Sequence, residues 1–319
     1  MPIFDHRSAE LQRRLYAGPD SVVARWLGPQ ALDCWRIDVA NMTGIFGDIN
    51  LSKEIALAVR KTMAETCPDS FLQAESNHDA SRDVIGDGYQ GTMNYAAFTR
   101  PLWQWLLPAQ PTPYEHGKYP SLPNLPGRLV VEAMRELSGV TPWMGTLHAM
   151  NLIGSHDTHR VASLLGDFDA VTVAFGMLAA YPGAPMIYAG DEIGLATFGP
   201  EYARIPMPWE HEERWDQARL AQTRAVFQFR STSDALLHGG LRWLSVEDDS
   251  MTFLRESPTE SVLVHASRAG HDPVRLPIAV TGETLEGLAG TSSLSAEADG
   301  FVTLPNGGPA FGMWRLQSK

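Results

Sequence analysis

The sequence predicts an α/β protein in which a parallel sheet covered by helices precedes a smaller antiparallel β domain. Three observations support this class. Short apolar runs alternate with helical patterns over residues 1–240, an acidic residue ends three of these runs, and short alternating stretches follow in residues 241–319. With 319 residues, 44% of them apolar, the chain is long enough for one large core and a smaller second one.

The predicted elements of residues 1–240 alternate along the chain. Residues 8–27 have a helical pattern with a break at Gly18, and Ser52 resembles an N-cap before a helix that ends near Cys67. Two further helices are predicted over residues 129–137 and 170–180. Strands are predicted at Leu32–Asp38, Phe71–Glu75, Thr92–Ala96, Asn151–Asp157 and Pro185–Ala189.

The number of strands indicates how the sheet is built. A (β/α)8 TIM barrel closes with eight strands, whereas five are predicted here, so a partial barrel is expected. Unpaired strand edges in such a sheet are unfavourable. The aromatic and proline-rich region 98–126 is a long insertion, and such insertions often carry function. Residues 241–319 are expected to form an antiparallel β-sandwich, with strands near residues 251–254, 261–265, 274–278 and 301–304.

Composition argues against two classes of partner. The net charge is −12, the pI is near 5.3, and the sequence has no cluster of Lys and Arg. Neither nucleic acid nor an anionic membrane is therefore an expected partner. The uncharged stretch 171–190 reaches membrane-spanning length, but Pro182, Gly183 and Pro185 interrupt it. We expect a helix, a turn and a strand there.

The cysteines and the first residues predict a cytoplasmic protein. Cys34 and Cys67 lie in or beside predicted strands and are expected to be reduced thiols, with a single disulfide left open. Residues 1–7 lack the basic, apolar and small-residue order of a secretory signal. Whether copies of the chain form a homo-oligomer is left open by the sequence.

Asp38, Glu75 and Asp157 are the candidate catalytic residues. The loops after barrel strands open on one face, so these three carboxylates are expected to converge there. Retaining cleavage of a glycosidic bond uses one carboxylate as nucleophile and a second, protonated one as acid, about 5 to 5.5 Å apart. Arg36, two residues before Asp38 on the same strand face, would hold that carboxylate ionised, whereas Glu75 needs a less polar setting near negative charge.

Alternative interpretations of these residues stay open. One acidic residue after a strand is more often a helix N-cap or turn residue than a catalyst. A metal-dependent hydrolase would use His156, Asp157 and His159, although their spacing matches no strong zinc pattern. Trp35, Trp103, Trp105, Trp143 and Trp209 have ring faces on which sugars could stack. Tryptophans are, however, more often core residues than sugar-binding residues.

At these positions the sequence resembles glycoside hydrolase family 13, the α-amylase family. Residues 34–41, 73–79 and 154–160 look like its second, third and fourth conserved regions, and residues 1–5 look like the fifth. Residues 188–194 and 204–209 are also similar to family stretches. Residues 39–41 and the form of the fifth region resemble the neopullulanase, cyclomaltodextrinase and α-glucosidase branch.

The resemblance implies a role for each matching residue. Asp38 would be the nucleophile, Glu75 the acid/base and Asp157 the transition-state stabiliser. Substrate binding would fall to Arg36, Asn41, His156 and Arg160. The implied substrates are maltodextrins or α-glucosides, with no cofactor and no metal.

The resemblance also implies which part of the family fold is present. The family's first conserved region is not found, so the chain would hold about strands 4 to 8 of the barrel and the following β-sandwich. An inactive or non-catalytic carbohydrate-binding homologue is the alternative.

Overall fold

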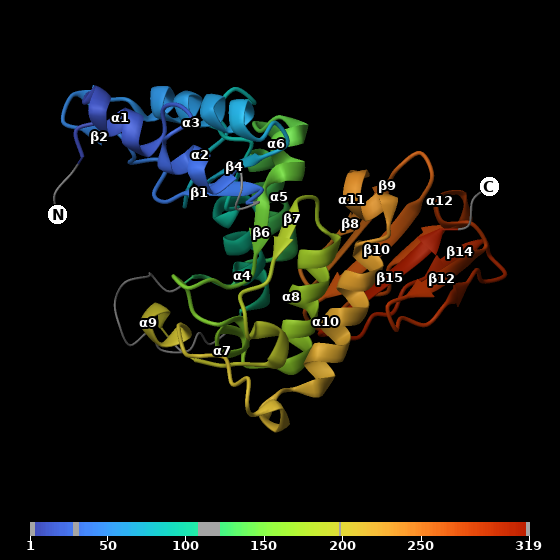
Figure 1. Cartoon of the computed structure of the whole chain (residues 1–319). Helices are drawn as coiled ribbons and strands as arrows, with labels where there is room; N and C mark the ends of the chain where they lie inside the picture. Colours follow the sequence, from blue (N-terminus) through green and yellow to red (C-terminus); the bar gives the residue numbers. More distant parts are fainter. Residues whose placement is uncertain (1–3, 28–31, 108–121, 198, 317–319) are drawn as a thin grey trace. The chain divides into compact units, whose positions relative to one another are not determined.

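The computed structural model describes residues 4–27, 32–107, 122–197 and 199–316, and part of the predicted insertion 98–126 lies outside them. The chain divides into two compact units, which we describe one at a time. The first contains Met1–Ala97 and Arg135–Met150, and the second contains Phe98–Met134 and Asn151–Lys319. Figure 1 labels their helices and strands.

The first unit is built on a parallel sheet of three strands in the order β1-β4-β5. Its elements are α1 (Ala9–Leu15), α2 (Val22–Leu27), β1 (Cys34–Ile37), β2 (Ile45–Phe46), β3 (Ile49–Asn50), α3 (Ser52–Thr66), β4 (Phe71–Ala74), β5 (Gly91–Thr92) and α6 (Trp143–His148). The predicted strands of this unit are therefore present in shorter form. Thr92–Ala96 is mostly not a strand, because the chain turns into a π-helix, η1 (Tyr95–Thr99), directly after β5.

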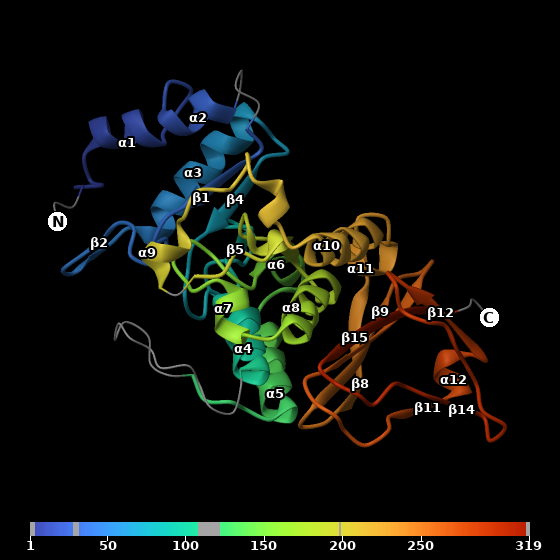
Figure 2. The same ribbon diagram turned by 90° about the horizontal axis from the view of Figure 1, so that it is seen from below.

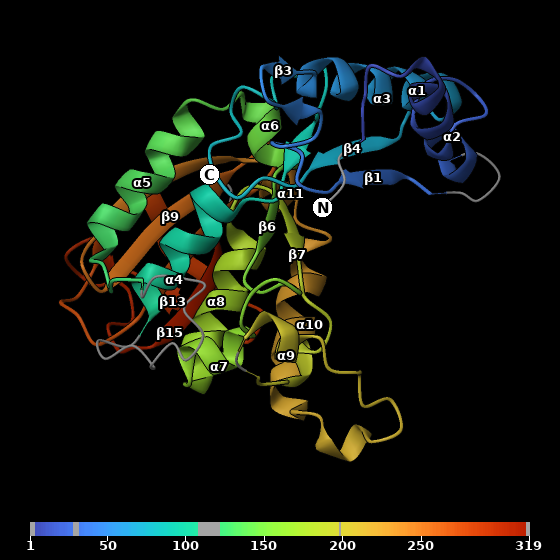
Figure 3. The ribbon, with the colours of Figure 1, turned by 90° about the vertical axis from the view of Figure 1, so that its left-hand side faces the viewer.

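Helix α3 gives the first unit its core. Ile55, Val59 and Met63 recur at helical spacing and are buried, and they cluster with Leu72 of β4. In both Figure 2 and Figure 3, α3 runs alongside β1 and β4. The predicted helix at residues 8–27 is split at Gly18, whose φ of 97° is a left-handed conformation that a helix does not contain.

The second unit contains helices and a larger antiparallel sheet. Its helices are α4 (Arg100–Leu106), α5 (Gly127–Gly139, which begins in this unit), α7 (Val161–Leu165), α8 (Phe168–Ala180), α9 (Pro200–Ala203), α10 (Gln217–Arg230), α11 (Asp234–His238) and α12 (Ile278–Thr281). Two short strands, β6 (Met150–Leu152) and β7 (Ala184–Met186), pair with each other. As predicted, the uncharged stretch 171–190 forms a helix, a turn and a strand, although β7 ends earlier than expected. No helix in the described ranges has both the length and the apolar character needed to cross a bilayer.

The remaining strands form a six-stranded antiparallel sheet in the order β13-β12-β15-β10-β9-β8 and a two-stranded sheet of β11 and β14. Their bounds are β8 (Gly240–Val246), β9 (Ser250–Glu256), β10 (Ser261–Ser267), β11 (Arg275–Pro277), β12 (Thr284–Leu288), β13 (Leu294–Ser295), β14 (Phe301–Thr303) and β15 (Ala310–Leu316). The predicted antiparallel strands are therefore present in this part of the chain.

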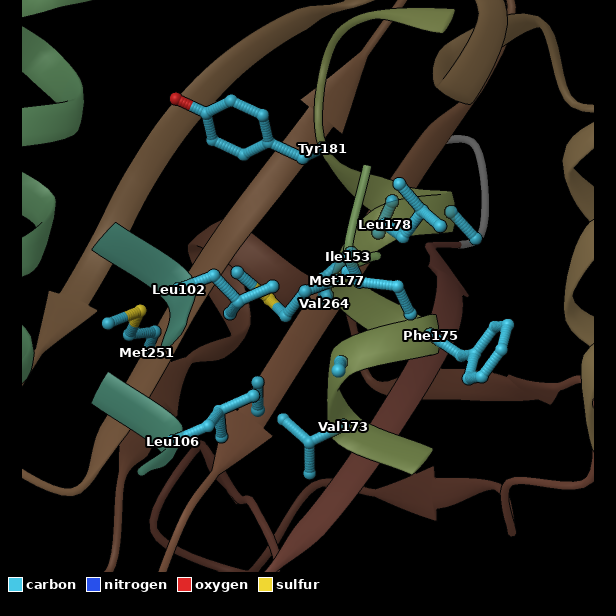
Figure 4. Close-up of a cluster of buried hydrophobic side chains, with 14 of the residues drawn as sticks. Leu102, Leu106, Ile153, Val173, Phe175, Met177, Leu178, Tyr181, Met251 and Val264 are labelled. Atoms are coloured by element: carbon cyan, nitrogen blue, oxygen red, sulfur yellow. The ribbon is translucent and has the colours of Figure 1, made fainter. Parts of the chain in front are cut away.

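Strands β9 and β10, in the middle part of the six-stranded sheet, are buried on both faces. Successive residues of β10 point to opposite sides, so Val264 joins a cluster with α8 whereas Leu263 joins a second cluster with Val302 of β14. Figure 4 shows part of the first cluster, with Leu102 of α4 and Met177 of α8 near Val264. In each of β9 and β10 all residues but one are buried, and these include polar side chains such as Thr252 and His265.

Candidate active site

Asp38 and Glu75 begin the loops that follow two neighbouring parallel strands. Ile37, the last residue of β1, is in register with Ala74, the last residue of β4. The Glu75 N–H donates to the Ile37 carbonyl, so the ladder continues to the point where the two carboxylates leave the sheet. Both acidic side chains are therefore at the carboxyl ends of adjacent strands, as the sequence predicts.

The guanidinium of Arg36 connects these two carboxylates. Its Nη2 donates to Asp38 Oδ1 at 2.7 Å, and its Nη1 lies 3.6 Å from Glu75 Oε1. The strand geometry that places residues i and i+2 on one face accounts for the first contact. The Asp38 side chain is 74% exposed, whereas that of Glu75 is 9% exposed. The exposed carboxylate of Asp38 is accessible to a substrate.

Val39 holds the second oxygen of Glu75 through its backbone. Its N–H donates to Glu75 Oε2 at 2.7 Å. Val39 has a φ of 44°, a left-handed conformation that is strained for a β-branched residue. Strain of this kind persists where the surrounding contacts fix it, and here the Ala40 N–H also donates to the Glu75 carbonyl.

The surroundings of Glu75 differ from the expectation in one respect. The side chain is buried, as a general acid requires, but a positive charge, that of Arg36, lies 3.6 Å from one of its oxygens. The same guanidinium also pairs with Asp38, so one cation is shared by two acids.

Asn41 lines a cavity in the first unit. The cavity has a volume of about 240 Å³. Among its other lining residues are His78, Arg82 and the ion-paired Lys53 and Asp87, with Lys53 Nζ at 3.2 Å from the Asp87 carboxylate. Asn41 is therefore open to a ligand on this polar surface.

Asp157 lies in the second unit, in the loop between β6 and α7. Both of its carboxylate oxygens are engaged, Oδ2 by His156 Nε2 at 3.1 Å and Oδ1 by Arg204 Nη2 at 2.8 Å. The Asp157 N–H donates to Ser155 Oγ at 3.1 Å. The structure thus places His156 and Asp157 together, as their adjacent positions predict.

Arg160 corrects one sequence-based expectation. It was expected to bind substrate, but its side chain is 1% exposed and donates to Asp191 Oδ1 at 2.8 Å and to the Ala203 carbonyl at 2.9 Å. Its guanidinium also lies over the ring of Tyr188. A buried cation needs such partners to offset its desolvation, so Arg160 is committed to the interior of its unit. Burial raises the pKa of Asp191, and the Arg160 cation opposes this rise.

The tryptophans and histidines considered in the sequence fall into different settings. Trp103 and Trp105 are core residues, while Trp143 and Trp209 are exposed.

His159 accepts the Gly199 N–H on Nδ1, and burial lowers the pKa of His159. In the described ranges, no three His, Cys, Asp or Glu residues are arranged to hold a metal ion. Both cysteines are free, and Cys34 is exposed.

Three contributors were not anticipated from the sequence. Val39 and Arg204 bond the candidate carboxylates directly, and Asp191 holds Arg160. Residues 188–194 and 204–209 resemble family stretches, which is the sequence signal for Asp191 and Arg204, but no role follows from that resemblance. A left-handed valine carries no sequence signal, because glycine is the residue normally associated with this conformation.

The geometry defines a carboxylate site of the kind found in glycosidases, and the comparisons name the family. Residues 1–279 match the family model for the α-amylase catalytic domain, so the chain belongs to the α-amylase family, glycoside hydrolase family 13. The similarity lies in its neopullulanase and cyclomaltodextrinase branch. The fold is accordingly related to the TIM barrel of that family.

Individual relatives have the following similarity. A cyclomaltodextrinase of Geobacillus thermopakistaniensis is 26% identical over 96% of this chain and 48% of its own length. Neopullulanase 2 of Thermoactinomyces vulgaris is 31% identical over 68% of this chain and 32% of its own length. The native structure of the Nostoc punctiforme debranching enzyme matches with a TM-score of 0.78 and 23% identity, over 92% of this chain and 60% of that chain. The chain thus spans about half the length, or less, of the cyclomaltodextrinase and the neopullulanase.

Proposed function

We propose that this chain carries the catalytic residues of a retaining glycoside hydrolase acting on the α-glucosidic bonds of maltodextrins or α-glucosides. The observation that carries the proposal is the shared Arg36 guanidinium between Asp38 and Glu75, at the ends of adjacent parallel strands. Retaining cleavage requires an ionised nucleophile and a protonated acid, and an exposed carboxylate beside a buried carboxyl group suits these two roles. Relatives named cyclomaltodextrinase and neopullulanase support the same chemistry.

In the proposed reaction Asp38 attacks the anomeric carbon and forms a glycosyl ester, while Glu75 gives its proton to the leaving oxygen. Glu75 then takes a proton from water, and the resulting attack on the ester restores Asp38. Arg36 orients Asp38, and the Val39 N–H orients Glu75. Asp157 would stabilise the positive charge that develops on the sugar ring, with His156 and Asn41 binding its hydroxyl groups.

We propose that residues 1–240 are the portion of the family barrel from about strand 4 to strand 8. The parallel order β1-β4-β5 and the alternation of strands with helices support this assignment. Residues 241–319 would be the β-sandwich domain, supported by the two sheets that enclose a common apolar cluster. A cytoplasmic location is part of the same proposal, supported by two free thiols and by a relative named intracellular maltogenic amylase.

The decisive experiment uses the Glu75→Gln variant with α-glucosyl fluoride. Fluoride leaves without a proton, so Asp38 can still form the glycosyl ester, but the ester persists because no base activates water. Mass spectrometry of the digested protein should find the sugar on the peptide that contains Asp38. Wild-type chain should turn over this substrate and p-nitrophenyl α-glucoside, and Asp38→Asn should do neither.

The control variant is Asp33→Asn, which changes an exposed aspartate directly before β1, the strand that Asp38 follows. It should retain wild-type turnover. Absence of turnover by the wild-type chain, together with absence of any adduct in Glu75→Gln, would contradict the proposed activity and favour a non-catalytic carbohydrate-binding role. An adduct on another residue would contradict the assignment of Asp38.

A further inference from the structure

Arg204 occupies a position that connects two segments of the second unit. It follows α9 in the long segment between β7 and α10, which is visible in Figure 3. Its Nη2 donates to Asp157 Oδ1 at 2.8 Å, and its Nε donates to the backbone carbonyl of His156 at 2.8 Å. One rigid guanidinium therefore holds both the peptide and the side chain of the candidate transition-state stabiliser.

The contacts at Asp157 leave its carboxylate little freedom. Oδ1 accepts from Arg204 and Oδ2 faces His156 Nε2 at 3.1 Å, so a rotation of the carboxylate would break both contacts. The carbonyl of His156 is fixed by the same guanidinium. The orientation of Asp157 is thus set before any sugar binds, which is the arrangement that lowers the reorganisation needed in a transition state.

A role in folding stability explains Arg204 less well. Its side chain is 55% exposed, and ion pairs at that exposure contribute little to the stability of a fold. The same two segments are already joined by buried contacts, Arg160 to Asp191 and the Gly199 N–H to His159 Nδ1. Loss of Arg204 would therefore remove orientation at Asp157 and leave the segments connected.

We propose that Arg204 is a positioning residue, which acts on the reaction by fixing the orientation of Asp157. This inference rests on the proposed function for its effect on turnover, because it requires Asp157 to stabilise the transition state. It does not require Arg204 to touch the substrate. Its loss should therefore lower kcat and leave KM nearly unchanged.

The test compares Arg204→Gln and Arg204→Lys in the full chain. Arg204→Gln should lower kcat about 10- to 100-fold on p-nitrophenyl α-glucoside with KM within about twofold, since a small misplacement of a catalytic group costs this much. Arg204→Lys keeps the charge and one contact, so its kcat should lie between those of the wild type and Arg204→Gln. The matched control is Arg214→Gln in the same segment, where Arg214 contacts Glu213 at 3.9 Å, and it should behave as wild type.

Hydrogen exchange provides a readout that does not depend on turnover. Amides of residues 155–158 should exchange faster in Arg204→Gln than in wild type or Arg214→Gln, whereas exchange in α8 should stay the same. A raised KM with unchanged kcat, or unchanged exchange at residues 155–158, would overturn the inference. If the wild-type chain lacks turnover, the proposed function fails, and faster exchange at these residues would still support the positioning of Asp157 by Arg204.

Discussion

At the scale of single residues, Val39 shows how a local conformation can serve a neighbouring acid. Its left-handed backbone directs its N–H to Glu75 Oε2, although the same conformation is unfavourable for a β-branched side chain. The residue is 46% exposed, so packing does not explain why a valine stands there. The conformation is held by hydrogen bonds to the backbone and side chain of Glu75.

We therefore expect Val39→Gly to stabilise the chain. Glycine relieves about 1 to 2 kcal/mol of strain and costs about 0.5 to 1 kcal/mol in backbone entropy, which leaves a net stabilisation of up to about 1.5 kcal/mol. Urea unfolding measures this change. Val140→Gly is the control, because Val140 is also exposed but has no positive φ, and it should lower stability. Equal destabilisation by both variants would show that Val39 is not strained.

The sequence predicted individual site residues best where the chain itself brings them together. Arg36 and Asp38 share a strand face, and His156 and Asp157 are adjacent, so their pairing follows from local geometry. Arg204 contacts Asp157 from 47 residues away, and no local periodicity encodes that distance. The burial of Arg160 was missed for the same reason, because its partner Asp191 lies in a separate segment.

At the scale of elements, predictions were most accurate for long periodic segments. Helices α3 and α8 were predicted from periodicity and composition, and both carry the buried residues of their cores. Strands β5 and β6 are shorter than predicted, since a strand of two or three residues has too few side chains to show a period. Helix α10 was not predicted, because its amphipathic pattern is weak and half of its residues are polar.

Strand β10 carries a buried histidine, bonded to a threonine of β9, that makes the sheet sensitive to acid. His265 is 3% exposed, its Nδ1 faces Thr252 Oγ1 at 2.8 Å, and its Nε2 faces the Pro305 carbonyl at 3.1 Å and His271 Nε2 at 3.3 Å. Because a carbonyl only accepts, Nε2 carries the proton and Nδ1 accepts from Thr252. The network thus suits a neutral imidazole, and burial with the neighbouring His271 lowers the pKa of His265 to about 4.

Stability should consequently fall as the pH is lowered from about 6.5 to about 4. In this range the unfolded chain binds a proton at residue 265 and the folded chain does not, so acid favours unfolding, by about 3 kcal/mol over the interval. Unfolding by urea at several pH values measures the slope. His265→Gln cannot take up the proton and should show a smaller acid loss, while His238→Gln leaves the network intact. If stability falls with pH equally in the wild type, His265→Gln and His238→Gln, the role of His265 is refuted.

At the scale of the whole molecule, the sequence predicts a change in character near residue 241 but does not predict how the following strands pack. Strand β8 begins at Gly240, and the antiparallel strands lie beyond it as predicted. The stretches after that point were predicted to alternate, yet β9 and β10 are buried on both faces because α8 covers one side of the sheet. Contacts between distant segments decide such burial, and a pattern within one strand does not record them.

Residues 1–240 are therefore not expected to be stable without residues 241–319. The cluster that contains Leu102 and Val173 also contains Phe253, Val264 and Met313 from three strands of the six-stranded sheet. Arg255 of β9 donates to the Ala180 carbonyl at 2.6 Å, which satisfies an acceptor at the end of α8. Truncation after residue 240 would expose this apolar surface and leave that buried acceptor without its donor.

The expected outcome is a truncated chain that binds a hydrophobic dye and lacks the cooperative urea transition of the full chain. The Arg255→Met variant of the full chain isolates one part of this effect, because it removes the donors but retains most of the buried volume. It should keep a cooperative transition at lower stability, by about 2 to 4 kcal/mol, since several buried carbonyls lose their partners. A truncated chain that unfolds cooperatively at the midpoint of the full chain would show that the sheet and α8 are independent in stability, whatever cluster they share.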